Sequence, residues 1–118
     1  MKRFGLLAAA GAIIGSLLRY AVALALPHTD PMMWPWATFS VNIIGALAIG
    51  IFASTPAVMN DEARRHFVVT GILGGFTTFS ALAVEVVDLS GVQAWLYVAL
   101  TFGLGMSATH VGSKLMKS

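Results

Sequence analysis

Residues 74–80 of the chain are Gly-Gly-Phe-Thr-Thr-Phe-Ser, and they lie inside an apolar run from about residue 67 to residue 87. The run is long enough to cross a bilayer by the rough twenty-residue rule. Paired glycines and three hydroxyl side chains are unusual for a purely structural span. Non-helical backbone at membrane depth is tolerated only where protein or a water-filled path surrounds it. The stretch therefore predicts a helix that is interrupted at an ion or substrate site.

The composition of the chain is that of an integral membrane protein. Of its 118 residues, 58% are hydrophobic and 10% are charged, and the mean hydropathy is +0.83. These values exclude an ordinary soluble domain, and the length allows about four spans. With no cysteine, the chain has no disulfide, thiolate metal site or cysteine nucleophile. The net charge of +2 and the basic residues at span ends favour topology signals over nucleic-acid binding.

Four apolar stretches predict one membrane domain that covers residues 1–118. The first stretch resembles a signal peptide, but it continues to residue 26 and therefore has the length of a span. The predicted spans cover about residues 4–26, 34–57, 67–88 and 93–112. The predicted fold is all-α, with four transmembrane helices of which the third is broken.

Basic residues gather on one side of this predicted bundle. With four spans, both termini and the middle loop share a side, whereas the other loops contain no Lys or Arg. That side holds Lys2, Arg3, Arg64, Arg65, Lys114 and Lys117. The positive-inside rule therefore predicts a multi-pass protein of the cell membrane with both termini in the cytoplasm.

Arg19 is an unusual residue because it lies inside the first predicted span, about a turn and a half before Leu26. A cation at membrane depth costs free energy. Arg19 either extends to the headgroups beside Tyr20 or forms the positive wall of an anion entrance. Spacing alone does not decide between these alternatives.

Polar side chains also share helix faces in the second and fourth spans. Asn42 lies one turn beyond Thr38. An intramembrane asparagine either bonds two helices together or lines a path as donor and acceptor. In the fourth span, Tyr97, Thr101 and Gly105 follow one another at one-turn spacing.

The sequence offers no catalytic or metal-binding cluster of side chains. Asp61, Glu62 and His66 are neighbours, but they occupy a short charged loop that we expect to be solvated. No nucleophile or acid–base pair stands out. We therefore predict that the protein is not an enzyme.

Three motifs closely resemble those of the Fluc/CrcB fluoride channels. They are Gly-Ser-Leu-Leu-Arg-Tyr at 15–20, Thr-Phe-Ser-Val-Asn-Ile-Ile-Gly at 38–45 and Gly-Ile-Leu-Gly-Gly-Phe-Thr-Thr-Phe-Ser at 71–80. The resemblance covers nearly the whole chain. It implies a fluoride-selective ion channel that lets fluoride leave the cell and so lowers its toxicity. It also implies an antiparallel dimer with two pores and a structural sodium ion, which is not transported, at the centre.

The resemblance assigns roles to residues around the break. Backbone carbonyls of the residues that match Gly74 and Thr77, from both subunits, hold the sodium ion in that family. The phenylalanine that matches Phe79 presents its ring edge, the positive part of the aromatic quadrupole, to fluoride. Amide and hydroxyl donors replace part of the hydration shell of the anion. We assign to the fluoride pore Phe79, Asn42, Thr101, Tyr97, Thr38 and Ser80, and to the anion entrance Arg19.

The chain departs from the family pattern after Ser80. The second pore phenylalanine of the family falls on Leu82, and Phe76 is no substitute because it precedes the threonines. The threonine that usually follows the motif serine is Ala81, and a fourth-helix serine falls on Gly105. The downstream part of the pore lining is therefore altered.

Two assemblies account for this departure. Homodimers of the family must insert in both orientations, which requires a weak charge bias, whereas the bias here is strong. One hypothesis is that the chain inserts one way and pairs with an oppositely oriented homologous subunit. Phe79 would then complete one pore with the partner, and Leu82 would impair the other. The alternative is a homodimer that tolerates leucine.

Two rival functions were weighed against a fluoride channel. A small multidrug-type, proton-coupled exporter needs a carboxylate embedded in the first span, which here contains Arg19 and no acid. A non-transporting assembly subunit would explain the glycines, but not the hydroxyls and Phe79 around the break.

Overall fold

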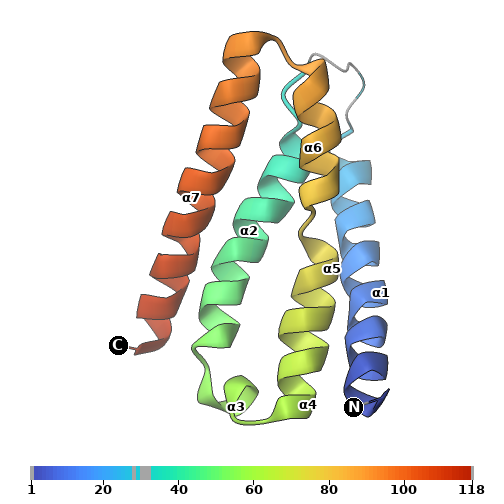
Figure 1. Cartoon of the computed structure of the whole chain (residues 1–118), viewed down its shortest axis with the longest axis vertical. Helices are drawn as coiled ribbons and strands as arrows, with labels where there is room; N and C mark the ends of the chain where they lie inside the picture. The colour runs from blue at the N-terminus through green and yellow to red at the C-terminus, as the bar shows by residue number, and fades with distance from the viewer. Residues whose placement is uncertain (1, 28, 30–32, 118) are drawn as a thin grey trace.

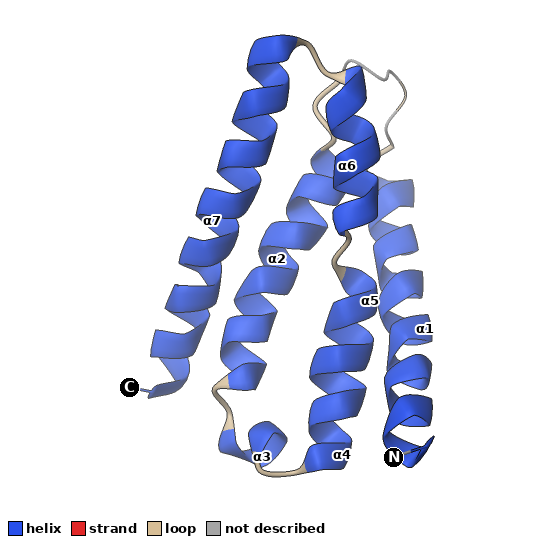
Figure 2. Cartoon of the chain, viewed as in Figure 1, coloured by secondary structure: helices blue, strands red, loops and turns tan. Residues whose placement is uncertain are grey.

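The computed structural model describes residues 2–27, 29 and 33–117. Side chains are described for all of these except residues 2 and 117. Every regular element in these ranges is helical (Figure 2). The long helices are α1 (Lys2–Ala25), α2 (Trp36–Ala53) and α7 (Gly91–Lys117). Between α2 and α7 lie the shorter elements α3 (Pro56–Met59), α4 (Glu62–Arg65), the π-helical η1 (His66–Leu73), α5 (Gly74–Phe76) and α6 (Phe79–Asp88).

The helices run side by side as an elongated bundle of 44 × 31 × 23 Å. In Figure 1, α4, η1, α5 and α6 follow one another as a single interrupted column beside α1 and α2. Both termini lie toward the end that carries α3 and α4, and the α6–α7 turn lies at the opposite end. The loop with Arg64 and Arg65 therefore shares an end of the bundle with the termini.

Three helical stretches are long and apolar enough to cross a membrane: Arg3–Ala25, Trp36–Ala53 and Glu62–Asp88. The expectation of an all-helical membrane protein is confirmed to this extent. The third stretch begins earlier than the predicted boundary at residue 67. The fourth predicted span lies within α7, which is 27 residues long but does not belong to this apolar set.

The third stretch is interrupted at two threonines. Before the interruption, η1 has the wider turns of a π-helix, which occur mostly as short insertions and often near functional sites. Helix α5 ends at Phe76, and both Thr77 (φ −77°, ψ 154°) and Thr78 (φ −149°, ψ 119°) are extended. Helix α6 then begins at Phe79. The break predicted within residues 74–80 thus lies at Thr77 and Thr78.

The backbone of α1 approaches this broken helix closely. A Cβ atom on Gly15 would overlap the carbonyl oxygen of Ile72, and a Cβ on Gly75 would lie 2.5 Å from the carbonyl oxygen of Ala12. Glycine is therefore required at both positions, as is common where membrane helices pack through small residues. This packing holds the half of α1 that contains Arg19 next to the break.

An aromatic cluster fixes α7 against α2 and α6. Tyr97 is fully buried and packs with Leu82 and Leu89. The ring of Trp34 lies edge-on to those of Tyr97 and Phe39, with centroids 5.3 and 5.6 Å away. Such aromatic pairs contribute about 0.5–1.5 kcal/mol each beyond the area they bury. The cluster fixes the position of Thr101, one turn further along α7.

The charged segment that precedes η1 forms a short helix rather than an open loop. Asp61 caps α4 by accepting hydrogen bonds from the backbone N–H groups of Ala63 and Arg64. The ring of His66 stacks on Phe4 of α1, with centroids 4.8 Å apart. The described residues contain no group of three or more His, Cys, Asp or Glu side chains that could hold a metal ion. The expectation that these acids form no metal site stays a prediction.

Candidate functional site

The side chain of Asn42 forms two hydrogen bonds with the interrupted backbone. Its amide Nδ2 donates to the carbonyl oxygen of Thr78 over 3.0 Å, and its Oδ1 accepts from the Thr78 backbone N–H over 2.8 Å. Both groups are partly buried. Of the two roles open for an intramembrane asparagine, bonding between helices is therefore observed. The pair connects α2 to the two extended residues of the break.

Two backbone N–H groups at the break donate to side chains instead of to helical carbonyls. In a continuous helix the Thr78 N–H would bond to the carbonyl of Gly74, but here it donates to Asn42. The Ala81 N–H would likewise bond to the carbonyl of Thr77, but it donates to Thr78 Oγ1 over 3.1 Å. The two carbonyls predicted to hold sodium are thus among those at this helix end that lose their helical donors.

Gly45 of α2 gives the break its close packing. A Cβ atom at Gly45 would overlap the methyl group of Thr77. The hydroxyl of Thr77 points back along its own helix and donates to the carbonyl of Leu73 over 3.0 Å. Thr77 is therefore fixed on both sides, while Gly74 lies exposed at the surface of the subunit.

A hollow of about 240 Å³ lies beside the break, between α2, α6 and α7. It brings together several of the predicted pore residues, which lie far apart in the sequence. Its lining consists of Asn42, Thr77, Thr78, Phe79, Leu82, Thr101 and Phe102. The hollow is thus a partly polar cavity that opens to the surface of the chain and has two phenylalanines, Phe79 and Phe102, in its lining.

Two lining residues are left without full contacts in the isolated chain. The side chain of Phe79 is 68% exposed. Thr101 is buried, yet its Oγ1 has no hydrogen-bond partner among the described residues. A buried hydroxyl without a partner costs about 1–3 kcal/mol, so such groups commonly serve a ligand or water. Thr101 therefore brings a hydroxyl without a protein partner to the lining of the hollow.

Leu82 contributes both to the buried cluster around Tyr97 and to the lining of the hollow. It is 4% exposed because it packs in the cluster with Leu89 and Tyr97, and it also lines the hollow with Phe79. An aliphatic side chain thus occupies the position where the family pattern has its second phenylalanine. The structure places this departure at the hollow itself.

Arg19 lies at a second, smaller hollow of about 150 Å³, on the other side of Thr78. This hollow is also lined by Thr38, Val41, Thr78 and Ala81, together with two alanines. The Nε atom of Arg19 is buried and has no hydrogen-bond partner in the described part of the chain. Arg19 thus lies next to the break, and its assignment to the anion entrance stays a prediction.

Tyr97 and Ser80 are not lining residues of either hollow. The hydroxyl of Tyr97 donates to the carboxylate of Glu85 over 3.4 Å in the aromatic cluster. Ser80 is exposed, and its Oγ lies 3.2 Å from the hydroxyl of Thr78 at the start of α6. In this arrangement Tyr97 supports the fold of the site, and Ser80 belongs to the cap of α6. Their assignment to the pore stays a prediction.

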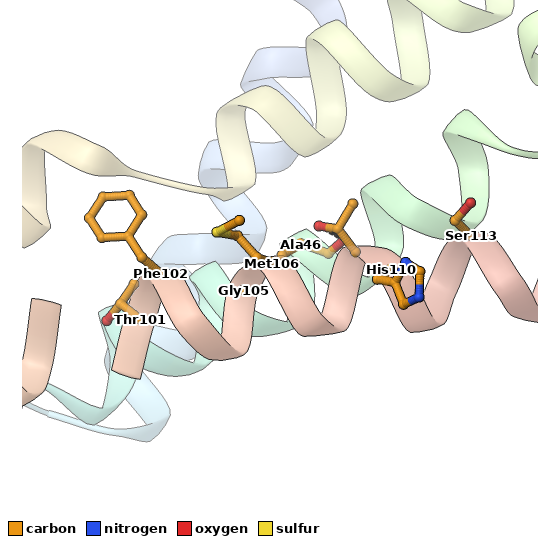
Figure 3. Close-up of a pocket in the computed structure, with 8 residues that line it drawn as sticks. Ala46, Thr101, Phe102, Gly105, Met106, His110 and Ser113 are labelled. Carbon is orange, nitrogen blue, oxygen red and sulfur yellow. Dashed lines mark hydrogen bonds between the residues drawn. The ribbon is translucent and has the colours of Figure 1, made fainter. Parts of the chain in front are cut away.

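A larger groove of about 580 Å³ continues from the first hollow along α7 (Figure 3). The two share Thr101 and Phe102, and Figure 3 shows His110 and Ser113 at the opposite end of the groove. Sequence analysis did not identify the groove. Its signal was the spacing of four that links Thr101, Gly105, Thr109 and Ser113 on one helix face.

The comparisons with known proteins agree on one family. The family model described as "CrcB-like protein, Camphor Resistance (CrcB)" matches residues 6–113. A protein of Hyphomonas neptunium named fluoride-specific ion channel FluC is 44% identical over 91% of this chain and 90% of its own length. Proteins of the same name from Allorhizobium ampelinum and a Roseiflexus species are 42% and 40% identical, over 88% and 89% of this chain and 88% and 90% of their own.

The comparisons confirm two predictions from the sequence, namely that the chain resembles the Fluc/CrcB family and that it is not an enzyme. The shared name of the relatives identifies them as ion channels, which agrees with the expectation that this protein is not an enzyme. The match over residues 6–113 includes all three motifs on which the resemblance was based. Together with its apolar helices, these matches make this chain a multi-pass membrane protein that belongs to the CrcB-like family.

Proposed function

We propose that this protein is a fluoride-selective ion channel that lets fluoride leave the cell and so lowers its toxicity. The observation that carries the proposal is the hollow beside the break, which is lined both by Phe79, whose ring is exposed, and by Thr101, whose buried hydroxyl has no partner among the described residues. A small, strongly hydrated anion requires donors that replace its water. Thr101 supplies a hydroxyl donor, and Phe79 a polarised ring edge.

Arg19 provides the positive potential of the proposed path. Its buried Nε lies at a hollow that shares Thr78 with the larger one. A fixed cation near a narrow path raises the local concentration of anions and disfavours cations. This favours an anion channel over the proton-coupled multidrug exporter, which needs an acid in α1.

A structural sodium ion fits the backbone of the break. The carbonyls of Gly74 and Thr77 lose their helical donors to Asn42 and to the hydroxyl of Thr78. Carbonyl oxygens released in this way are hard ligands that suit an alkali cation. The ion would supply a fixed positive charge near the anion path, without being transported itself.

The channel is proposed to work as an antiparallel dimer. The exposure of Phe79 and Gly74 supports this arrangement, because a second subunit would cover both and would complete the set of carbonyls. We place both termini in the cytoplasm, since the α3–α4 segment lies at the same end of the bundle as the termini.

Two alternatives exist for the second subunit. One-way insertion, favoured by the charge bias, requires a homologous partner of opposite topology. A homodimer that tolerates Leu82 is the alternative.

Fluoride efflux from liposomes tests the proposal. We expect flux when the chain is reconstituted with a co-expressed homologue of opposite topology, and little flux from the chain alone. The substitution Phe79→Ile serves as a control because it removes the ring edge at an exposed position, where the effect on stability is small. Unchanged flux in Phe79→Ile would show that the pore assignment is wrong. Strong flux from the chain alone would favour the homodimer.

A further inference from the structure

The groove along α7 leads from the hollow at the break toward the end of the bundle that carries the termini (Figure 3). Since Thr101 and Phe102 line both spaces, an anion that leaves the hollow meets the groove next. We infer that the groove is an antechamber of the anion path, and that His110 forms an anion-binding site in it whose protonation increases fluoride entry. This inference rests on the proposed channel function and adds a regulated binding site to it.

The hydroxyl groups of the groove are partly committed to the fold. Thr109 Oγ1 donates to the carbonyl of Ala46 over 3.0 Å, and Ser54 Oγ donates to Ser113 Oγ over 3.0 Å. These bonds hold α7 against α2 and fix the shape of the groove. His110, by contrast, is exposed on the groove. Its imidazole is therefore in position to contact an ion that enters.

His110 is the titratable residue among those that line the groove. Helices α2 and α3 contribute no ionisable side chain to this region. Lys114 lies one turn further along α7 and keeps its charge at neutral and mildly acidic pH. Glu85 belongs to α6, which meets α7 at the other end of the bundle, beside Tyr97. On α4 and its cap, Arg64 pairs with Asp61 and Arg65 with Glu62. Arg3, near the start of α1, lies over the ring of Phe4.

A protonated imidazole at this position would bring both charge and donors to the groove. Histidine changes its charge between about pH 5 and pH 8. The protonated ring carries a positive charge and two N–H donors, both of which favour an anion. A cation in a groove with low-dielectric walls also raises the local anion concentration. Fluoride stays largely ionised in this range, so the effect falls on the permeant ion itself.

Fluoride current across planar bilayers tests the inference, because current reports the ion and not neutral hydrogen fluoride. The experiment uses the assembly that conducts, either the chain alone or the chain with its homologue. We expect the wild-type current at about pH 5.5 to be about two to three times that at pH 8, which is the effect of one unit charge near a hydrated path. His110→Gln should give the lower current at both pH values, and His110→Lys the higher current at both.

His66→Gln is the matched control, since His66 lies at the same end of the bundle but stacks on Phe4 outside the groove. It should keep the wild-type pH response. The inference is overturned if the wild-type current does not depend on pH, or if His110→Gln responds to pH as the wild type does. If the His110→Gln variant cannot be reconstituted, His110→Lys takes its place in the test. A pH-dependent current in His110→Lys would then overturn the inference. A complete absence of fluoride current in every assembly refutes the proposed function, and this inference with it.

Discussion

Asn42 exchanges two hydrogen bonds with the backbone of Thr78, which lies 36 residues further along the chain. Through one of them, a side chain of α2 takes the place of the helical partner that the Thr78 N–H gives up. The broken helix is thus held in its interrupted form by a residue outside it. This relationship links the polar residue in the second span to the glycine and threonine stretch in the third.

Asn42→Asp should impair both the fold and the channel. A carboxylate accepts from the Thr78 N–H but does not donate to its carbonyl, so one bond of the pair is lost. The loss of a partner for a buried polar group costs about 1–3 kcal/mol. The added negative charge at the hollow should also repel fluoride. Fluoride flux from liposomes should fall at least about tenfold, the effect of about 1.4 kcal/mol.

Asn42→Ala separates the two effects of that substitution. It removes both hydrogen bonds without adding a charge, so it should lower stability while repelling fluoride less than Asn42→Asp. Thermal unfolding in detergent and fluoride flux are measured side by side. Equal flux in wild type and Asn42→Asp would contradict the location of the anion path next to Asn42.

Thr78→Ala should weaken the start of α6 and the proposed sodium site together. The hydroxyl of Thr78 caps α6 by accepting from the Ala81 N–H. Loss of such a cap costs about 1 kcal/mol. The Ala81 N–H then becomes available to the carbonyl of Thr77, which should compete with a bound cation. We expect a lower unfolding temperature than in wild type. We also expect the extra stabilisation that sodium chloride gives over potassium chloride to be smaller in the variant than in wild type.

Thr78→Ser is the control for this prediction, because it keeps the hydroxyl cap. It should retain the wild-type preference for sodium. If Thr78→Ala kept that preference in full, the cation would not depend on the carbonyl of Thr77.

Gly15→Ala should destabilise the packing of α1 against the broken helix. The new methyl group would overlap the carbonyl oxygen of Ile72, so the two backbones must move apart. Overpacking of this kind costs about 1–3 kcal/mol. Gly5→Ala is the matched control on the same helix, since a Cβ there meets nothing within 4 Å. It should be neutral or raise stability by up to about 1 kcal/mol, because alanine favours helix.

The unfolding temperatures of both variants in the same detergent check this pair. Equal temperatures for Gly15→Ala and Gly5→Ala would show that α1 has room to shift. The close approach at Gly15 would then not constrain the position of Arg19.

The sequence predicted the helical spans and the region of the break because both depend on local properties. Apolar runs of span length predict helices, and residues 74–80 contain the glycines and hydroxyls that favour an interruption. The position of the break could not be deduced in this way. It depends on Asn42, whose contact with Thr78 is a property of the tertiary fold.

The candidate site, like the fold, was predictable only in part from the sequence. Asn42, Phe79 and Thr101 were assigned to the pore and lie around one hollow, although no measurement here tests their role. Tyr97 was assigned with them from its spacing on the helix, but the aromatic cluster buries it completely. His110 was not predicted, because it lies outside the spacing of four that links Thr101 to Thr109 and Ser113, and its place on the groove depends on the tertiary fold.

Leu82→Phe should restore the aromatic residue that the second pore lacks. Leu82 is 4% exposed, so a larger ring cannot fit within the cluster around Tyr97 without strain, but it also borders the hollow of about 240 Å³. We expect the ring to extend into that space, at a cost of about 1–3 kcal/mol in stability. In a dimer with an oppositely oriented homologue, flux should rise about twofold, because two pores then contain both rings.

Leu82→Met is the control, since it nearly conserves volume and adds no ring. It should leave both flux and stability close to wild type.

The response of the chain alone distinguishes the two assemblies. If the chain inserts one way only, Leu82→Phe without a partner remains inactive, because no antiparallel dimer forms. A large gain of flux by Leu82→Phe alone would instead mean that the chain inserts in both orientations and that Leu82 limits a homodimeric pore.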